Sequence, residues 1–426
     1  MAEDTCENQT YESMKTQAAS VLEALADYVD GFVSKVVSVC LESLTVQFGL
    51  RPQQGKGLLS KEEAFLILSV LSCQISSRND LLFEIRTFLA NSKAVLSQLN
   101  ELELSRLYIF LSYNFIELFD DELELGTPYL QSAFGRHTHP TVEHIALDFI
   151  FNQTENYCSI DLFVELFDRT LVCEVGILWD IFQMYVTKKR SLLSEPILMQ
   201  LVDSLYKRVD IDLGKILRNE TDNSLLLIKS LNVVHEVAKN TSYLRDKPFV
   251  SDKIWSIIDI LKHLHQIEFE DDIIGILTAI LEQKEEFEER EMALLPYIEA
   301  IFQKYKLVYN CLFKPINLFI LNSPFTEENG VAIRLLKLCV LGLNPTYEKK
   351  QNEDVGEALL LLQLMLSKAH KLLPVATLTE VAGVLKNVIT STKSAIVRAR
   401  VFNSLALMYP RLDCREVFPL VIGKAE

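Results

Sequence analysis

The sequence has few of the residues that break helices. Its 426 residues include 14 glycines and 12 prolines, well below the average usage of about 7% and about 5%. Leucine, glutamate, alanine and lysine, which favour helices, are plentiful. Segments in which apolar and polar residues alternate, as in half-buried strands, are almost absent. The composition therefore predicts an all-α protein and argues against a turn-rich sheet.

Positive charge and long apolar runs are also scarce. Lysine and arginine together number 42 against 58 aspartates and glutamates, which gives a formal net charge of −16. Because clustered lysine and arginine carry phosphate binding, we expect a basic protein partner and no direct nucleic-acid ligand. The longest apolar run, residues 358–366, is interrupted by Gln363 and falls short of the ~20 residues that cross a bilayer. No membrane insertion is predicted.

The eight cysteines form no compact pattern. They are scattered, mostly within apolar helical segments, and no C-x-x-C pair occurs, so a disulfide framework is not indicated. We expect buried thiols in an intracellular protein. The first ten residues, MAEDTCENQT, are acidic and polar, and we expect them to be neither a signal peptide nor a transit peptide.

The sequence motifs of common enzyme classes are missing. The stretch Gly55-Lys56-Gly57 lacks the spacing of a P-loop, and the chain contains no G-x-S-x-G, H-E-x-x-H or G-x-G-x-x-G. We therefore predict that the protein is not an enzyme and binds no cofactor.

One stretch, HTHPTVEH at residues 137–144, has a spacing that zinc hydrolases can use. It holds His137, His139 and His144 with Glu143 close by. Pro140, however, is typical of the first turn of a helix, which leaves His137 and His139 in a turn and only His144 on the helix. Such an arrangement does not bring three ligands together, so we predict no metal site, with zinc as the alternative.

Apolar residues recur at intervals of three and four along most of the chain, as on one face of a helix. Start and stop signals divide the pattern into pieces of about 12 to 18 residues. Ser60 and Glu63 form a capping box, and Pro196 suits a first turn. We expect a loop and several helix breaks at these places: Gly49–Gly57, Gly126–Pro128, Pro248, Pro324, Pro345 and Pro410.

About twenty helices with short connections make about ten pairs of roughly 40 residues, the period of HEAT and armadillo repeats. We therefore predict one continuous HEAT-like solenoid over residues 1–426, a right-handed superhelix of antiparallel helix pairs without a separate catalytic domain. The segments THPTVEHIALDFIF and TKSAIVRARVFNSLALMYP fit such helices. Their apolar positions, among them Val142, Ile150, Val401 and Leu405, are expected in the core.

Acidic residues cluster at two places in the second half of the chain, at Asp271 and Asp272 and at residues 282–292. The run EQKEEFEEREM, residues 282–292, places four glutamates around Phe287, and two aspartates stand near the start of the preceding predicted helix. We predict that a basic partner binds here, with a merely solvated helix face or loop as the alternative. The six candidate residues are Glu285, Glu286, Glu288, Glu289, Asp271 and Asp272.

The HEAT-like segments and a longer stretch, EREMALLPYIEAIFQKYKLVYNCLFKPINLFI at residues 289–320, resemble the importin-beta (karyopherin) superfamily. The likeness is to the larger cargo importins and the CAS-like exportins. It rests on Leu294-Leu295-Pro296, Phe302, Tyr309, Pro315 and Leu318-Phe319.

The resemblance implies a nuclear transport receptor that carries basic protein cargo between cytoplasm and nucleus through the nuclear pore. It also implies Phe-Gly nucleoporins and the Ran GTPase as partners. The N-terminal arch that binds Ran in this family is not recognisable here, which leaves Ran binding open. A HEAT-repeat scaffold subunit of a larger intracellular complex is the alternative, because fold does not fix function.

Overall fold

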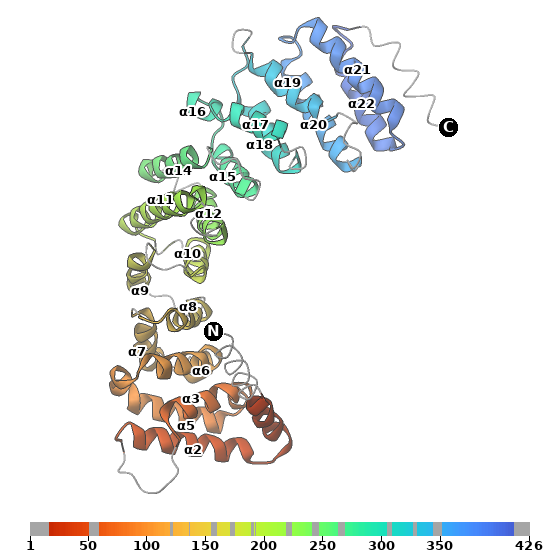
Figure 1. Cartoon of the computed structure of the whole chain (residues 1–426). Coiled ribbons are helices and arrows are strands. Elements are labelled where there is room, and N and C mark those ends of the chain that lie inside the picture. The colour runs from red at the N-terminus through yellow and green to blue at the C-terminus, as the bar shows by residue number, and fades with distance from the viewer. Residues whose placement is uncertain are drawn as a thin grey trace. The chain divides into compact units, whose positions relative to one another are not determined.

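The regular secondary structure of the chain is helical, and no strand occurs among the residues that the computed structural model describes (Figure 1). The described residues are 17–50, 59–119, 122–135, 137–154, 160–170, 175–188, 191, 193–218, 224–240, 247–262, 269–304, 309–326, 330–343 and 352–412. Within these ranges, no helix is both long and apolar enough to cross a membrane. The predicted all-α helical-repeat fold is confirmed.

The chain forms two compact units, Met1–Ser204 and Leu205–Glu426. The boundary between them falls inside one helix, α11 (Glu195–Leu217). Each unit is a helical repeat in its own right. The single continuous superhelix over residues 1–426, and its right-handedness, stay predictions.

In the first unit, a row of stacked helices forms the core. These helices begin at residues 61, 101, 140 and 177, so successive starts lie 37 to 40 residues apart, and each helix packs against the next. The row consists of α3 (Lys61–Val70), α6 (Glu101–Phe119), α8 (Pro140–Thr154) and α10 (Ile177–Lys188). Beside it lie α2 (Phe32–Gln47), α4 (Ser72–Ser76), α5 (Asn79–Ser92), α7 (Leu123–Phe134) and α9 (Ile160–Glu165), with the 3-10 turns η1 (Lys93–Gln98) and η2 (Phe167–Arg169).

The second unit repeats this plan. Its stacked helices begin at residues 224, 270, 309, 352 and 395, which are 39 to 46 residues apart, and again each packs against the next. The row consists of α12 (Ser224–Ala238), α15 (Glu270–Leu281), α18 (Tyr309–Asn322), α20 (Asn352–Ala369) and α22 (Ala395–Met408). Its other helices are α14 (Pro248–Leu261), α16 (Glu289–Met292), α17 (Leu295–Lys304), α19 (Val331–Leu341) and α21 (Val375–Ser391).

Helices of the two rows are apolar on more than one face because they have neighbours on more than one side. The clearest instance is α15, which packs against α12, α14 and α18 and buries almost every residue from Ile273 to Leu281. The two segments expected to be HEAT-like helices behave as predicted. Pro140 opens α8, and the expected core residues Val142, Ile150, Val401 and Leu405 are buried.

Hydrogen bonds between side chains and carbonyl groups join helix ends that lie one repeat apart. Tyr129 Oη donates to the carbonyl oxygen of Leu89 at 2.7 Å, 40 residues earlier in the chain. Arg411 Nη1 donates to the carbonyl oxygen of Leu373 at 2.7 Å, just after α20 ends and 38 residues earlier. In both cases a side chain of one repeat binds a backbone carbonyl of the repeat before it.

The expected break at Gly126–Pro128 is wrong, because α7 runs through both residues. Gly126 lies where α7 packs on α6: a Cβ atom there would be 2.7 Å from Cζ of Phe115 and 3.0 Å from Cγ of Phe119. The glycine serves close helix packing and not a turn. Pro128 is the sixth residue of α7, beyond the first turn, so the helix lacks one backbone hydrogen bond at this point.

Other expected boundaries are confirmed. The capping box at Ser60 and Glu63 is present, α14 begins at Pro248, and α22 ends shortly before Pro410. α18 ends at Asn322, two residues before Pro324. Most of the expected loop Gly49–Gly57, and Pro345, lie outside the described residues.

The cysteine interpretation is correct for Cys40 and Cys339, which are buried, and wrong for Cys73 and Cys311, which are exposed. Cys73 belongs to the short helix α4, and Cys311 to the first turn of α18. Such positions at a helix end reach beyond the stacked neighbours. The remaining four cysteines lie outside the described residues.

We expect Leu405→Ala to destabilise the end of the second unit by about 2 to 5 kcal/mol. Leu405 is fully buried in α22, which packs against α20 and α21, so its truncation leaves a cavity. In a helical repeat each pair contacts only its neighbours. Amide hydrogen exchange should therefore accelerate in α20, α21 and α22 and stay unchanged in the first unit.

The matched control is Leu360→Ala in α20, since Leu360 is 40% exposed and its removal leaves no closed cavity. That variant should exchange like the wild type. If Leu405→Ala accelerated exchange evenly through both units, the repeat description of the fold would be contradicted.

Candidate protein-binding site

The four predicted glutamates lie together on one short segment between α15 and α16. We call residues 285–289 the acidic segment; it follows α15 and ends with Glu289, the first residue of α16. All four glutamate side chains are exposed. None of them forms an ion pair with another residue of the described part of the chain. Four exposed carboxylates therefore lie within five residues, and that of Glu288 also caps α16 by accepting a hydrogen bond from the N–H of Glu291.

The acidic segment is held in place by Phe287, which is only 4% exposed. Its ring packs edge-on against Phe319 of α18, with 5.0 Å between ring centroids, and its N–H donates to the carbonyl oxygen of Asn322 at 3.0 Å. Asn322 Nδ2 in turn donates to the carbonyl oxygen of Lys284 at 2.9 Å. The segment is thus fixed to the C-terminal end of α18, one repeat away.

Nearby cations do not neutralise the acidic segment. Three of them pair with carboxylates outside it: Lys284 with Glu291 at 3.9 Å, Arg290 with Asp252 at 3.1 Å, and Lys314 with Glu282 at 2.5 Å. Arg290 also lies over the ring of Trp255, 4.7 Å from its centroid. Because these cations are already engaged, the negative potential of the four glutamates is left available to a ligand.

The structure separates the two predicted aspartates from the glutamates. Asp271 and Asp272 stand in the first turn of α15, whereas the acidic segment follows its other end. A helix of 12 residues is about 18 Å long. Asp271 is exposed and Asp272 is half-buried, and burial, together with the charge of Asp271, raises the pKa of Asp272 above its usual range. The six candidates thus form two acidic sites and not one.

The histidine-rich stretch forms the turn between α7 and α8. As predicted, Pro140 is the first residue of α8, His137 and His139 precede it, and His144 lies on the helix. His139 and His144 are exposed, while His137 is half-buried against Tyr108, with 5.7 Å between ring centroids. Among the described residues, no group of three or more histidine, cysteine, aspartate or glutamate side chains has an arrangement suited to a metal ion.

Carboxylates bind the backbone of this turn. Glu101 of α6 accepts hydrogen bonds from the N–H groups of Thr138 at 2.6 Å and His139 at 3.0 Å. Glu143 accepts from the N–H of His137 at 3.2 Å and from Nη1 of Arg169 at 2.9 Å. Arg169, which is buried, also donates to the carbonyl oxygens at the end of α7. These groups have a structural role that joins three repeats.

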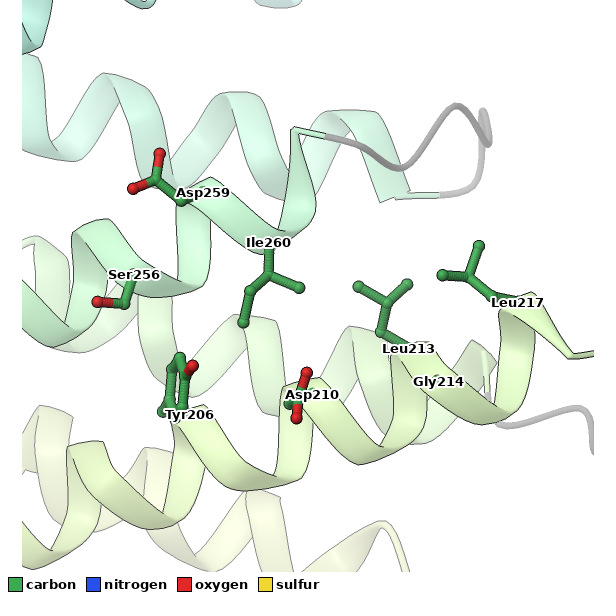
Figure 2. A pocket seen from close by; sticks show the side chains of 8 residues that line it. All are labelled: Tyr206, Asp210, Leu213, Gly214, Leu217, Ser256, Asp259 and Ile260. Atoms are coloured by element: carbon green, nitrogen blue, oxygen red, sulfur yellow. The ribbon is translucent and has the colours of Figure 1, made fainter.

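Two functional features were missed at the sequence level. One is the anchoring role of Phe287, for which an apolar residue inside an acidic run was the available signal. The other is a groove of about 540 Å³ between α11 and α14, in the second unit (Figure 2). No local sequence pattern predicts the groove, because the residues of its two walls are 39 to 54 positions apart in the chain.

Comparisons with protein-family models and with curated protein sequences found no match to this chain.

We expect the stability of the first unit to fall as the pH is lowered from about 7 to about 5, in part because of His137. Burial lowers the pKa of His137, and the opposing effect of Glu143 does not overcome it. Between the ordinary histidine pKa of about 6.5 and the lower folded pKa, only the unfolded chain takes up the proton. His137→Gln should therefore flatten the dependence of unfolding free energy on pH.

The chain offers a clean probe for this measurement. Its two tryptophans, Trp179 and Trp255, lie in different units, so fluorescence of a Trp255→Phe background reports on the first unit. The control is His139→Gln in the same turn, where the side chain is exposed. Equal pH slopes for His137→Gln and its parent would rule out this role of His137.

Proposed function

We propose that the acidic segment binds a basic protein, and that the protein is an importin-beta-like nuclear transport receptor for such cargo. The observation that carries the proposal is a set of four exposed carboxylates without ion pairs among the described residues, on a segment anchored by Phe287. An anchored segment loses little conformational freedom when a ligand binds, so more of the interaction energy contributes to affinity.

Charge complementarity is the physical basis of this binding. A cluster of like charges attracts an oppositely charged ligand over about 8 to 10 Å at ordinary ionic strength, which raises the association rate. Each exposed ion pair contributes only about 0 to 1 kcal/mol. Several glutamates acting together are therefore required, and binding should weaken steeply with salt.

The assignment to nuclear transport is supported by the resemblance over residues 289–320, a range that includes α16, α17 and most of α18. The acidic segment leads directly into that stretch. A helical repeat suits a receptor of this kind because its surface is long for its mass. On this proposal the Ran GTPase and Phe-Gly nucleoporins are further partners, and the protein moves between cytoplasm and nucleus.

The first test reverses the charge of the acidic segment. A variant with Glu285, Glu286, Glu288 and Glu289 all changed to lysine should bind a labelled histone-tail peptide at least tenfold more weakly at low salt, since up to about 1 kcal/mol is lost at each position. The slope of affinity against salt concentration should also become shallower. Fluorescence anisotropy titrations at two salt concentrations measure both.

The control variant makes the same change of charge elsewhere. Glu84, Glu117, Asp148 and Glu380 are exposed, form no ion pair within the described part of the chain, and can be changed together to lysine. This variant should keep most of the affinity. Equal losses in the two variants would mean that only net charge matters, and no loss in either would leave the acidic segment without a binding role.

A second experiment separates the transport receptor from the static scaffold. Immobilised protein is incubated with Ran loaded with GTP and, separately, with a Phe-Gly repeat peptide. The transport proposal expects the repeat peptide to bind and Ran-GTP to release the basic peptide. Retention of the basic peptide with no binding of either probe would favour the scaffold.

A further inference from the structure

A groove between α11 and α14 has the size and lining of a binding site. All of the residues that line it belong to the second unit, and its volume of about 540 Å³ lies within the range of about 300 to 1,000 Å³ that is usual for ligand pockets. Leu213 and Leu217 rise from α11, and Ile260 reaches toward them from α14 (Figure 2). These three side chains make an apolar centre.

The apolar centre is open to a ligand. Leu217 is 63% exposed, whereas Leu213 is buried at the base of the groove. The guanidinium of Arg218 lies beside Gly214, with Nη1 3.4 Å from where a Cβ atom of that glycine would stand. Tyr206 stands at one end of the groove (Figure 2).

Two carboxylates line the groove. Asp210 of α11 and Asp259 of α14 are both exposed. Asp259 has a partner, Lys262, at 2.7 Å, and Asp210 forms no ion pair with any residue that the structure describes. Lys253 lies over the ring of Tyr206, with its Nζ atom 4.8 Å from the centroid, and is not part of the lining. Asp210 is therefore the lining carboxylate left available to a cation, and a ligand for this lining is apolar with a positive charge.

The groove is connected to the acidic segment through α14. Asp252, on this helix, pairs with Arg290 directly after the acidic segment, and Asp259 lies two turns further along. Seven residues of helix span about 10 Å, a distance that three or four residues of extended peptide cover. One polypeptide can therefore reach both places.

We propose that the groove binds a segment of the basic partner in which a lysine or arginine lies next to a leucine or another large apolar residue. The apolar side chain packs between Leu213, Leu217 and Ile260. The cation lays its aliphatic stem along the same surface and places its charged head between the carboxylates of Asp210 and Asp259. This assignment rests on the proposed function for the basic character of the partner, and it adds an apolar requirement to the charge.

The test uses the full chain and two labelled peptides. The first is a 16-residue arginine- and lysine-rich peptide with one central leucine, and the second has serine in place of that leucine. The groove variants are Asp210→Asn with Asp259→Asn, which preserves shape and removes charge, and Leu217→Ser, which alters an exposed residue and leaves the core intact.

Wild-type protein should bind the leucine peptide at least fivefold more tightly than the serine peptide. Leu217→Ser should abolish this preference, and the double aspartate variant should weaken the leucine peptide at least fivefold. The double variant Asp148→Asn with Glu380→Gln, which makes the same change of net charge outside the groove, should bind like the wild type.

Failure of this inference is distinguishable from failure of the proposed function. If the four-lysine variant of the acidic segment loses affinity while both groove variants bind both peptides like the wild type, the groove is not a docking site and the proposed function stands. If only the groove variants lose affinity, the groove is a binding site for the peptide and the acidic segment is not. A third result would overturn the peptide as the occupant of the groove. In that result the wild type binds octylammonium ion, the groove variants do not, and the wild type shows no preference for the leucine peptide over the serine peptide.

Discussion

A pair of helices of this length cannot bury its apolar residues alone, and every feature of the chain follows from that constraint. Each helix of a stacked row packs against the equivalent helix about 40 residues away. Residues such as Ile274 and Ile276 in α15 are buried on opposite sides because neighbours cover the helix on more than one face. Stacking thus sets the spacing of the helices and explains why apolar residues lie on more than one face of a helix such as α15.

Stacking also determines where polar groups are used. Helix ends come to lie beside the ends of equivalent helices, and side chains such as Tyr129, Asn322 and Arg411 bond carbonyl groups one repeat earlier. A connecting segment that would be loose in an isolated helix pair is then fixed by its neighbours. In the acidic segment, this fixation holds exposed carboxylates in one place, and it makes a surface loop into a candidate binding site.

The sequence was sufficient wherever a local signal decides the outcome. Proline at the first turn predicted the start of α8, the capping box predicted the start of α3, and the three-and-four spacing predicted Leu405 in the core. The sequence was insufficient where contacts between repeats decide the structure. The local sequence predicts a turn at Gly126. In the structure, the rings of Phe115 and Phe119 lie so close to Gly126 that the glycine serves helix packing.

The candidate site shows the same division. The four glutamates are exposed, as expected for charged side chains in a connecting segment, but charge alone does not decide exposure, because Glu291 in the same run is buried. Two other properties depend on neighbouring helices: the burial of Phe287 against α18, and the groove beside α14. Neither of these is encoded within a single stretch of sequence.

The central claim is that the acidic segment binds because Phe287 fixes it to α18. The most direct measurement is the affinity of Phe287→Ala for a histone-tail peptide at low salt, with Phe83→Ala as the control because Phe83 is 71% exposed. The account predicts weaker binding and faster hydrogen exchange in residues 284–289, although all four glutamates are still present. It also predicts that Phe287→Ala adds little once those glutamates are changed to glutamine, since both changes act through one site. Unchanged affinity in Phe287→Ala, with the segment released from α18, would contradict the account.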